Sequence, residues 1–175
     1  PYAKLLATTV LTAVYLLIGP QAAADAISPA PADLTPWAGR DIWLGADSTV
    51  NGGLLAGRNV SVNQSGDLRN VYSVGNTYLD RDARIAGSVL AGGSANAGRN
   101  LNVTGNWTGR SASLDRDAFV GGDVTAATGQ ISLSRNADVG GSVGGNAGIW
   151  IDRDSSVAGD VSPGPGRSLS TGRNV

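Results

Sequence analysis

The stretch LDRDAFVGGDV occupies residues 114–124, and LSRNADVGGSV repeats its pattern at residues 133–143. Further copies read LDRDARIAGSV at 79–89, AGRNLNVTGNW at 97–107 and IDRDSSVAGDV at 151–161. The central arginines of these five copies are Arg81, Arg99, Arg116, Arg135 and Arg153, and Arg173 is central in the shorter string TGRNV at 171–175. The spacing from one arginine to the next is 18, 17, 19, 18 and 20. A nearly fixed period with short apolar segments is typical of repeat architectures.

Apolar or small residues alternate with polar ones after each arginine. The alternating positions in two successive copies are Ala118, Val120, Gly122, Val124 and Ala137, Val139, Gly141, Val143. A period of two predicts a strand with one face turned inward, and the glycine either leaves little room for bulk or marks a bend. We expect Val139 to point inward between Val120 and Val157, and Ser142 to point outward on the same strand.

Short strands that recur with this spacing predict an all-β fold, a single-stranded parallel β-helix or β-solenoid. Each coil cannot bury its apolar face alone, so neighbouring coils stack into one continuous core. About eight coils at ~4.8 Å would form a rod of roughly 40 Å. A sandwich built from hairpins stays an alternative, although it would not require one fixed spacing along the chain.

The composition narrows the possible functions. The 175 residues include 26 glycines but no cysteine, histidine or methionine, and the net charge is −1. Lys4 is the single lysine, and all fourteen acidic residues are aspartates. Thiolate sites and histidine chemistry are therefore excluded, and no basic patch suits nucleic acid. We expect no catalytic residues, no metal, no cofactor and no nucleic-acid partner.

The N-terminal segment has the layout of a secretory signal peptide. Lys4 precedes an apolar run from Leu5 to Gly19, Pro20 interrupts it, and small residues follow. This predicts a signal peptide over residues 1–24, with cleavage after Ala24 or Ala26. The run is shorter than the ~20 residues of a spanning helix, so we expect no membrane span after its removal.

The predicted mature chain has two parts. Residues 25–36 are rich in proline, which predicts an extended linker. The solenoid is expected over residues 37–175. Its last string, Thr171–Val175, starts another coil and stops inside it, so we expect a C-terminal end that is truncated or open.

The LDRDA strings could be an acid/base device or a structural ladder. Stacked coils would place the residues after the arginines in a column of alternating aspartate and asparagine, which keeps like charges apart. We favour a ladder because a catalytic site needs one special constellation, not several equivalent ones. Its members are Arg81, Asp82, Arg99, Asn100, Arg116, Asp117, Arg135, Asn136, Arg153 and Asp154. A β-helix polysaccharide lyase or hydrolase stays a minor alternative.

The chain resembles the bactofilin family of polymer-forming β-helix proteins, in a secreted variant. The resemblance rests on GSV at 87–89 and 141–143 and on GDV at 122–124 and 159–161, each two residues after an aliphatic residue. It covers roughly residues 40–175. The resemblance implies a right-handed, triangular β-helix that associates end to end.

Two tryptophans are candidates for ligand contact. Trp43 and Trp150 each precede an aliphatic residue expected to point inward, so both should face solvent, and exposed apolar side chains often mark contact sites. Our first functional hypothesis is a secreted or cell-surface scaffold or filament subunit. The second is an adhesin-like stalk that binds cell-surface glycan or extracellular matrix.

Overall fold

The computed structural model describes residues 34–175, with the backbone alone for residues 34–38. The predicted signal peptide and residues 25–33 of the predicted linker lie outside the described residues. Residues 34–36, also assigned to that linker, belong to the first strand, which begins at Leu34. The sheet therefore starts before the predicted boundary at residue 37.

The described residues form three parallel sheets and no helix, as the sequence predicted. Sheet A contains β1 (Leu34–Ala38), β3 (Gly53–Ala56), β6 (Val71–Ser73), β9 (Val89–Ala91), β12 (Trp107–Gly109), β15 (Val124–Ala126), β18 (Val143–Gly145) and β21 (Val161–Ser162). Sheet B contains β2 (Ile42–Leu44), β4 (Val60–Val62), β7 (Thr77–Leu79), β10 (Ser94–Ala97), β13 (Ser111–Leu114), β16 (Ile131–Leu133), β19 (Ile149–Ile151) and β22 (Leu169–Thr171). Sheet C contains β5 (Asp67–Leu68), β8 (Arg84–Ile85), β11 (Asn102–Val103), β14 (Phe119–Val120), β17 (Asp138–Val139) and β20 (Ser156–Val157).

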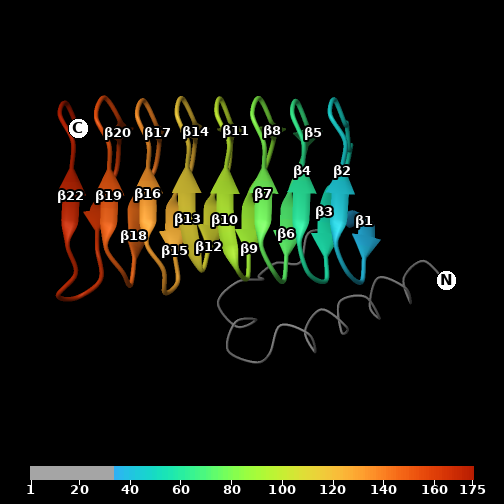
Figure 1. Ribbon diagram of the computed structural model, residues 1–175, viewed down its shortest axis with the longest axis horizontal. Helices are drawn as coiled ribbons and strands as arrows, with labels where there is room; N and C mark the ends of the chain where they lie inside the picture. Colours follow the sequence, from blue (N-terminus) through green and yellow to red (C-terminus); the bar gives the residue numbers. More distant parts are fainter. Residues whose placement is uncertain (1–33) are drawn as a thin grey trace.

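The chain winds through the sheets in the order B, C, A and returns to B one level further along the rod (Figure 1). The first inward residues of the sheet B strands pair in the sequence Ile42, Val60, Thr77, Ala95, Ala112, Ile131, Ile149 and Leu169. The parallel β-solenoid is confirmed, with about 18 residues per turn. It has about 7 turns, against about eight coils predicted.

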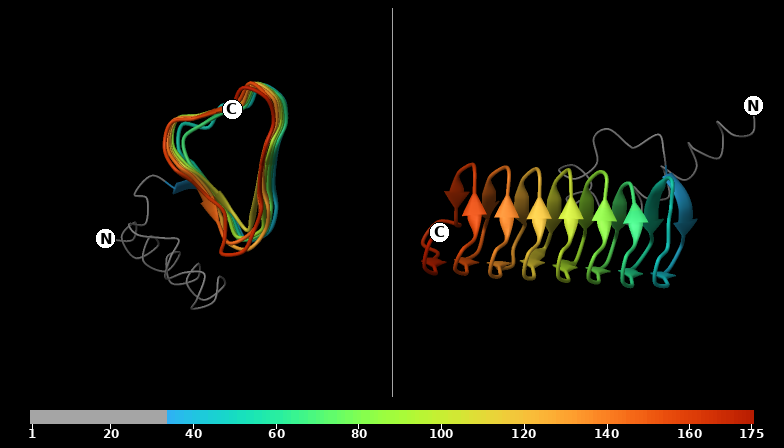
Figure 2. Two further views of the ribbon diagram at one scale, coloured as in Figure 1. Left: turned by 90° about the vertical axis from the view of Figure 1, so that its left-hand side faces the viewer. Right: turned by 90° about the horizontal axis from the view of Figure 1, so that it is seen from above.

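The coils superimpose into a triangular outline when viewed along the rod (Figure 2). One sheet lies along each side of the triangle, and we call each level of the stack a rung. Because every interior strand pairs with the strands of the rungs before and after it, its backbone groups are satisfied within the sheet. Within residues 34–175, the strand edges without a pairing partner lie at the two ends of the rod.

The core is a set of inward columns that run along the rod. Val139 is fully buried and pairs with Val120 on one side and Val157 on the other, as predicted. Ser142, however, does not share a strand with Val139, because β17 ends at Val139 and β18 begins at Val143. The alternation that suggested one strand spans two short strands, and the glycines between them form a corner.

The largest buried side chain, Trp107, replaces a valine of its column. Its strand β12 contacts β10 and β13, which present Ala95 and Ala112 where later rungs of sheet B carry Ile131 and Ile149. The small residues opposite thus compensate for the indole volume, as a close-packed core requires. The indole Nε1 has no hydrogen-bond partner within residues 39–175, which costs about 1–3 kcal/mol.

Candidate functional site

The arginine corner is the turn between each sheet B strand and the following sheet C position, and it contains the LDRDA strings. One residue per rung adopts the left-handed conformation there, with φ between 54° and 61°. These residues are Asp47, Ser65, Asp82, Asn100, Asp117, Asn136, Asp154 and Asn174. Aspartate and asparagine tolerate this conformation better than other non-glycine residues, which explains their choice at this position.

Backbone hydrogen bonds join the arginine corners of successive rungs. The N–H of Asp82 donates to the carbonyl of Arg99 at 2.9 Å, and the N–H of Asn100 donates to the carbonyl of Arg116 at 3.1 Å. The first aspartate of each LDRDA string acts locally, since Asp80 Oδ1 accepts the N–H of Arg81 at 2.8 Å. Both aspartates of the string therefore have a structural role: the first accepts a hydrogen bond within the turn, and the second bonds to the next rung.

Side-chain hydrogen bonds join the left-handed column in pairs of rungs. Nδ2 of Asn100 donates to Asp82 Oδ1 at 2.9 Å. The same bond recurs from Asn136 to Asp117 at 2.8 Å and from Asn174 to Asp154 at 2.9 Å. The repeating unit of this corner is thus two coils: an aspartate rung and the following asparagine rung.

The side chain of Arg81 at this corner bonds to the preceding rung and not to an aspartate. Arg81 donates from Nε and Nη2 to Gln64 Oε1 at 3.0 and 2.8 Å. Among residues 39–175, no ion pair joins the arginines of the predicted ladder (Arg81, Arg99, Arg116, Arg135, Arg153) to an aspartate. If the flanking aspartates offset the positive charge of these arginines, they do so in this part of the chain without an ion-pair contact.

The glycine corner is the turn between each sheet C strand and the next sheet A strand, and it carries a second ladder. The side-chain oxygen of one rung accepts the backbone N–H of the next: Asn106 Oδ1 from Asp123 at 2.9 Å, and Asp123 Oδ1 from Ser142 at 2.8 Å. The full column is Asn70, Ser88, Asn106, Asp123, Ser142 and Asp160. This ladder was not predicted from the sequence, although its members fill the middle place of each GSV and GDV string.

The glycines of this corner make room for that ladder. A Cβ on Gly122 would collide with Asn106 Oδ1, and a Cβ on Gly141 would collide with Asp123 Oδ1. Neither glycine has a positive φ. Arg69 occupies the place that Gly122 and Gly141 hold on their rungs. At the ladder position of the rung before it stands Gly53, which has no side chain, so the Arg69 side chain has room.

A third ladder follows the turn from sheet A to sheet B. Asn59 Oδ1 accepts the N–H of Asn76 at 2.8 Å, Asn76 Oδ1 accepts the N–H of Ser94 at 2.8 Å, and Nδ2 of Asn59 donates to Asp41 Oδ1 at 2.8 Å. All three corners are thus held by hydrogen bonds between successive rungs. Asparagine and aspartate side chains make the hydrogen bonds between rungs at each of these corners, which accounts for the abundance of the two residue types.

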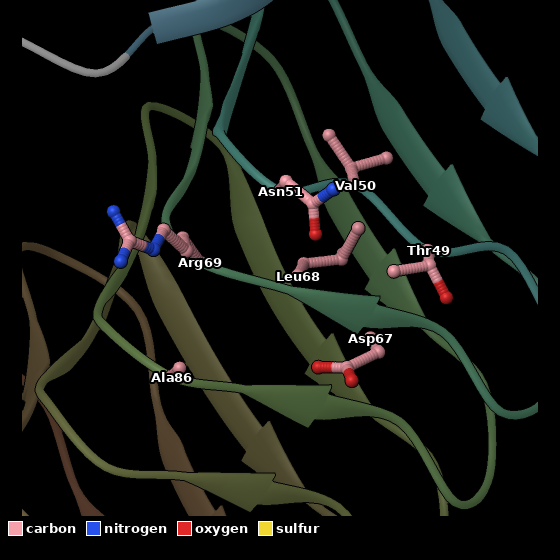
Figure 3. A pocket seen from close by; sticks show the side chains of 7 residues that line it. All are labelled: Thr49, Val50, Asn51, Asp67, Leu68, Arg69 and Ala86. Carbon is pink, nitrogen blue, oxygen red and sulfur yellow. The ribbon is translucent and has the colours of Figure 1, made fainter.

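A pocket of about 290 Å³ lies beside the first three rungs (Figure 3). Its lining comprises Thr49, Val50, Asn51, Asp67, Leu68, Arg69 and Ala86. The lining contains one carboxylate, Asp67, with the Arg69 side chain at the opposite end of β5 (Figure 3). Glycoside hydrolysis by the usual route needs two facing carboxyl groups, and this lining supplies one.

Over the described residues, no group of three or more acidic side chains is arranged to hold a metal ion. The same residues contain no helix of the length and apolarity that crossing a bilayer requires. Tyr72, on the outward side of sheet A between Leu55 and Leu90, is half buried, and this desolvation raises the pKa of its phenol.

Both candidate tryptophans lie on the outward side of sheet B. Trp43 is 70% exposed and Trp150 is 40% exposed. Tyr78, which was not predicted as a contact residue, lies in the same column and is 47% exposed. The sequence did contain the signal, because Tyr78 also directly precedes an inward aliphatic residue, Leu79.

Comparison with known proteins adds no relative. No family model matches the chain, and no curated protein or solved structure does so. The resemblance to bactofilins therefore stays a prediction from the repeated strings.

Proposed function

We propose that this chain is an exported, non-enzymatic scaffold whose β-solenoids associate head to tail into filaments at the cell surface. The observation that carries the proposal is the in-register stack of three parallel sheets over residues 34–175, in which each rung adds to the one before it in the same way. Leu169 pairs with Ile149 as the last member of the inward column of sheet B, yet it is 45% exposed. An inward residue left uncovered, beside an unpaired strand edge, favours the addition of another rung.

The strand edges at the two ends of the rod complement each other. Over residues 34–175, β20, β21 and β22 each pair on one side only, and so do β1 and β2 at the other end. β22 belongs to an asparagine rung through Asn174, whereas β2 belongs to an aspartate rung through Asp47. A second copy placed head to tail would therefore set an aspartate rung on an asparagine rung, which continues the alternation of the arginine corner.

The export part of the proposal rests on the N-terminal sequence. The order of Lys4, apolar run, Pro20 and small residues is that of a secretory signal. Sequencing the exported protein should find an N-terminus at Asp25 or Ile27. Lys4 still attached to the exported chain would contradict this part alone.

Filament formation is tested with the exported chain and a matched pair of variants. We expect rods of variable length by negative-stain microscopy and mass that grows with concentration by sedimentation. Leu169→Arg places a charge on the open core and should leave monomers, because docking would bury it unpaired. Phe119→Arg is the control, since Phe119 is 38% exposed on the side of the rod in sheet C.

Circular dichroism should show the same β content in both variants as in the parent chain. Filaments that persist in Leu169→Arg, or that disappear equally in Phe119→Arg, would contradict head-to-tail docking through β22. A parent chain that stays monomeric at high concentration would overturn the filament proposal as a whole.

A further inference from the structure

The outward side of sheet B carries one continuous central column of side chains. The strand register places its members in the order Trp43, Ser61, Tyr78, Asn96, Ser113, Ser132, Trp150 and Ser170. None of them is charged at neutral pH. We call this set the sheet B column.

Aromatic residues in the sheet B column keep a strict phase. Numbering the rungs from β2, Trp43, Tyr78 and Trp150 occupy the first, third and seventh rungs. The even rungs hold only small polar residues, namely Ser61, Asn96, Ser132 and Ser170. The aromatic side chains are therefore separated by two and by four rungs, or about 10 and 19 Å at ~4.8 Å per strand.

The chemistry of this column selects a class of partner. Aromatic faces pack against apolar C–H surfaces, and hydroxyl and amide groups between them exchange hydrogen bonds. A pyranose presents both kinds of surface, with C–H groups on its ring face and hydroxyls on its rim. The lack of charge in the column favours a neutral polymer over an anionic one, which would need cations.

The two-rung phase also selects the shape of that partner. In an extended β-1,4-linked glycan, alternate sugars present the same face, and the disaccharide is about as long as two rungs. A chain laid along the rod would meet Trp43, Tyr78 and Trp150 with sugars in equivalent orientation. We propose that the sheet B column binds a neutral, extended β-1,4-linked polysaccharide aligned with the solenoid axis.

A peptide strand is a poorer fit to this face. Strand addition needs unpaired backbone groups, and the interior strands of sheet B are paired on both sides. The proposal is independent of filament formation, because the column lies on the side of the rod and not at its ends.

The first experiment measures depletion of the folded chain by insoluble cellulose and chitin, with starch and polygalacturonate as α-linked and anionic comparisons. We expect binding to at least one of the two β-1,4-linked polymers and none to the comparisons. Trp43→Ala combined with Trp150→Ala should weaken binding at least tenfold. Phe119→Ala, which removes an exposed aromatic side chain from sheet C, should leave binding unchanged.

The second experiment tests the phase directly with two serines of the same column. Ser113→Trp adds an aromatic residue on the fifth rung, the odd rung that lacks one, and should tighten binding several-fold. Ser132→Trp adds the same side chain on an even rung and should not. Equal effects of the two variants would overturn the two-rung match.

Loss of binding in Phe119→Ala as well, or no binding of the parent chain to either β-1,4-linked polymer, would overturn the proposal. Lateral association of copies that the Trp43 and Trp150 substitutions abolish would also overturn it in favour of a protein contact. The Leu169→Arg variant separates the two functions, because a monomer should still bind the polymer. Its failure to bind while retaining its fold would overturn the proposal.

Discussion

The arginine corner and the glycine corner turn the same chain by different chemistry. At the arginine corner the backbone itself is unusual, with φ near +60° at one residue of each rung, and aspartate or asparagine occupies most of these positions. At the glycine corner no residue has a positive φ, yet glycine recurs on rung after rung. Glycine is therefore absent from the position where its conformational freedom would be useful, and present where φ does not need it.

The difference shows that two separate constraints shape the repeat. The arginine corner needs a side chain, because Asn136 Nδ2 donates to Asp117 Oδ1 of the rung before it, a contact that glycine could not make. The glycine corner needs the absence of a side chain, because the oxygen of Asn106 occupies the space beside Gly122. One constraint is conformational and the other is steric.

The largest expected effect lies in the strand between the two corners. Val139→Asp would bury a carboxylate with no partner in a fully buried column, and we expect destabilisation of about 3–5 kcal/mol. Chemical unfolding monitored by circular dichroism measures this change. Ser142→Asp is the matched control, because Asp123 already performs the same ladder role one rung earlier. Comparable small losses in both variants would contradict the observed register.

The steric constraint at the glycine corner is tested by Gly122→Ala. The new methyl group would force Asn106 and the Gly105 carbonyl to move, with an expected loss of about 1–3 kcal/mol in unfolding free energy. Gly144→Ala should cost little, because a Cβ there meets only the Ser162 carbonyl, at 3.7 Å. Asn106→Gly combined with Gly122→Ala should cost less than the sum of the single changes. Strict additivity would argue against the shared space.

The conformational constraint at the arginine corner is tested by comparing Asn136→Ala with Asn136→Gly. Alanine is strained at φ 57° and loses the bond to Asp117, so we expect about 1–2 kcal/mol of destabilisation. Glycine loses the bond but keeps the conformation, and it should cost less than alanine. Thermal melts of the two variants beside the parent chain decide the order. An equal loss would assign the whole effect to the hydrogen bond.

The smallest expected effect concerns charge in the same column. Asn136→Asp replaces the donor to Asp117 by a carboxylate and also faces Asp154 on the next rung. We expect a loss of about 0.5–1 kcal/mol that shrinks as salt is added, because exposed like-charge pairs are of that order. Unfolding curves at low and high ionic strength measure it. Stability that is unchanged at low salt would show that the two-coil alternation does not serve charge separation.

Much of the fold could be predicted because the same coil pattern recurs several times along the sequence. The spacing of the arginines set the coil length, and the alternation around Val139 set which side chains are buried. The boundary between β17 and β18 could not be predicted in the same way. The inward period of two continues across Gly140 and Gly141, so the pattern alone does not distinguish a corner from a strand.

The sequence by itself determined the coil length, the inward columns and the outward placement of Trp43 and Trp150. Each follows from periodicity, a property of one coil read along the chain. Only the tertiary structure decided what successive rungs do to one another. It assigned Asp123 to a ladder, gave Gly141 its steric reason and aligned Tyr78 with the two tryptophans. Those relations join residues that lie one or more whole coils apart in the sequence, and they exist only once the coils are stacked in register.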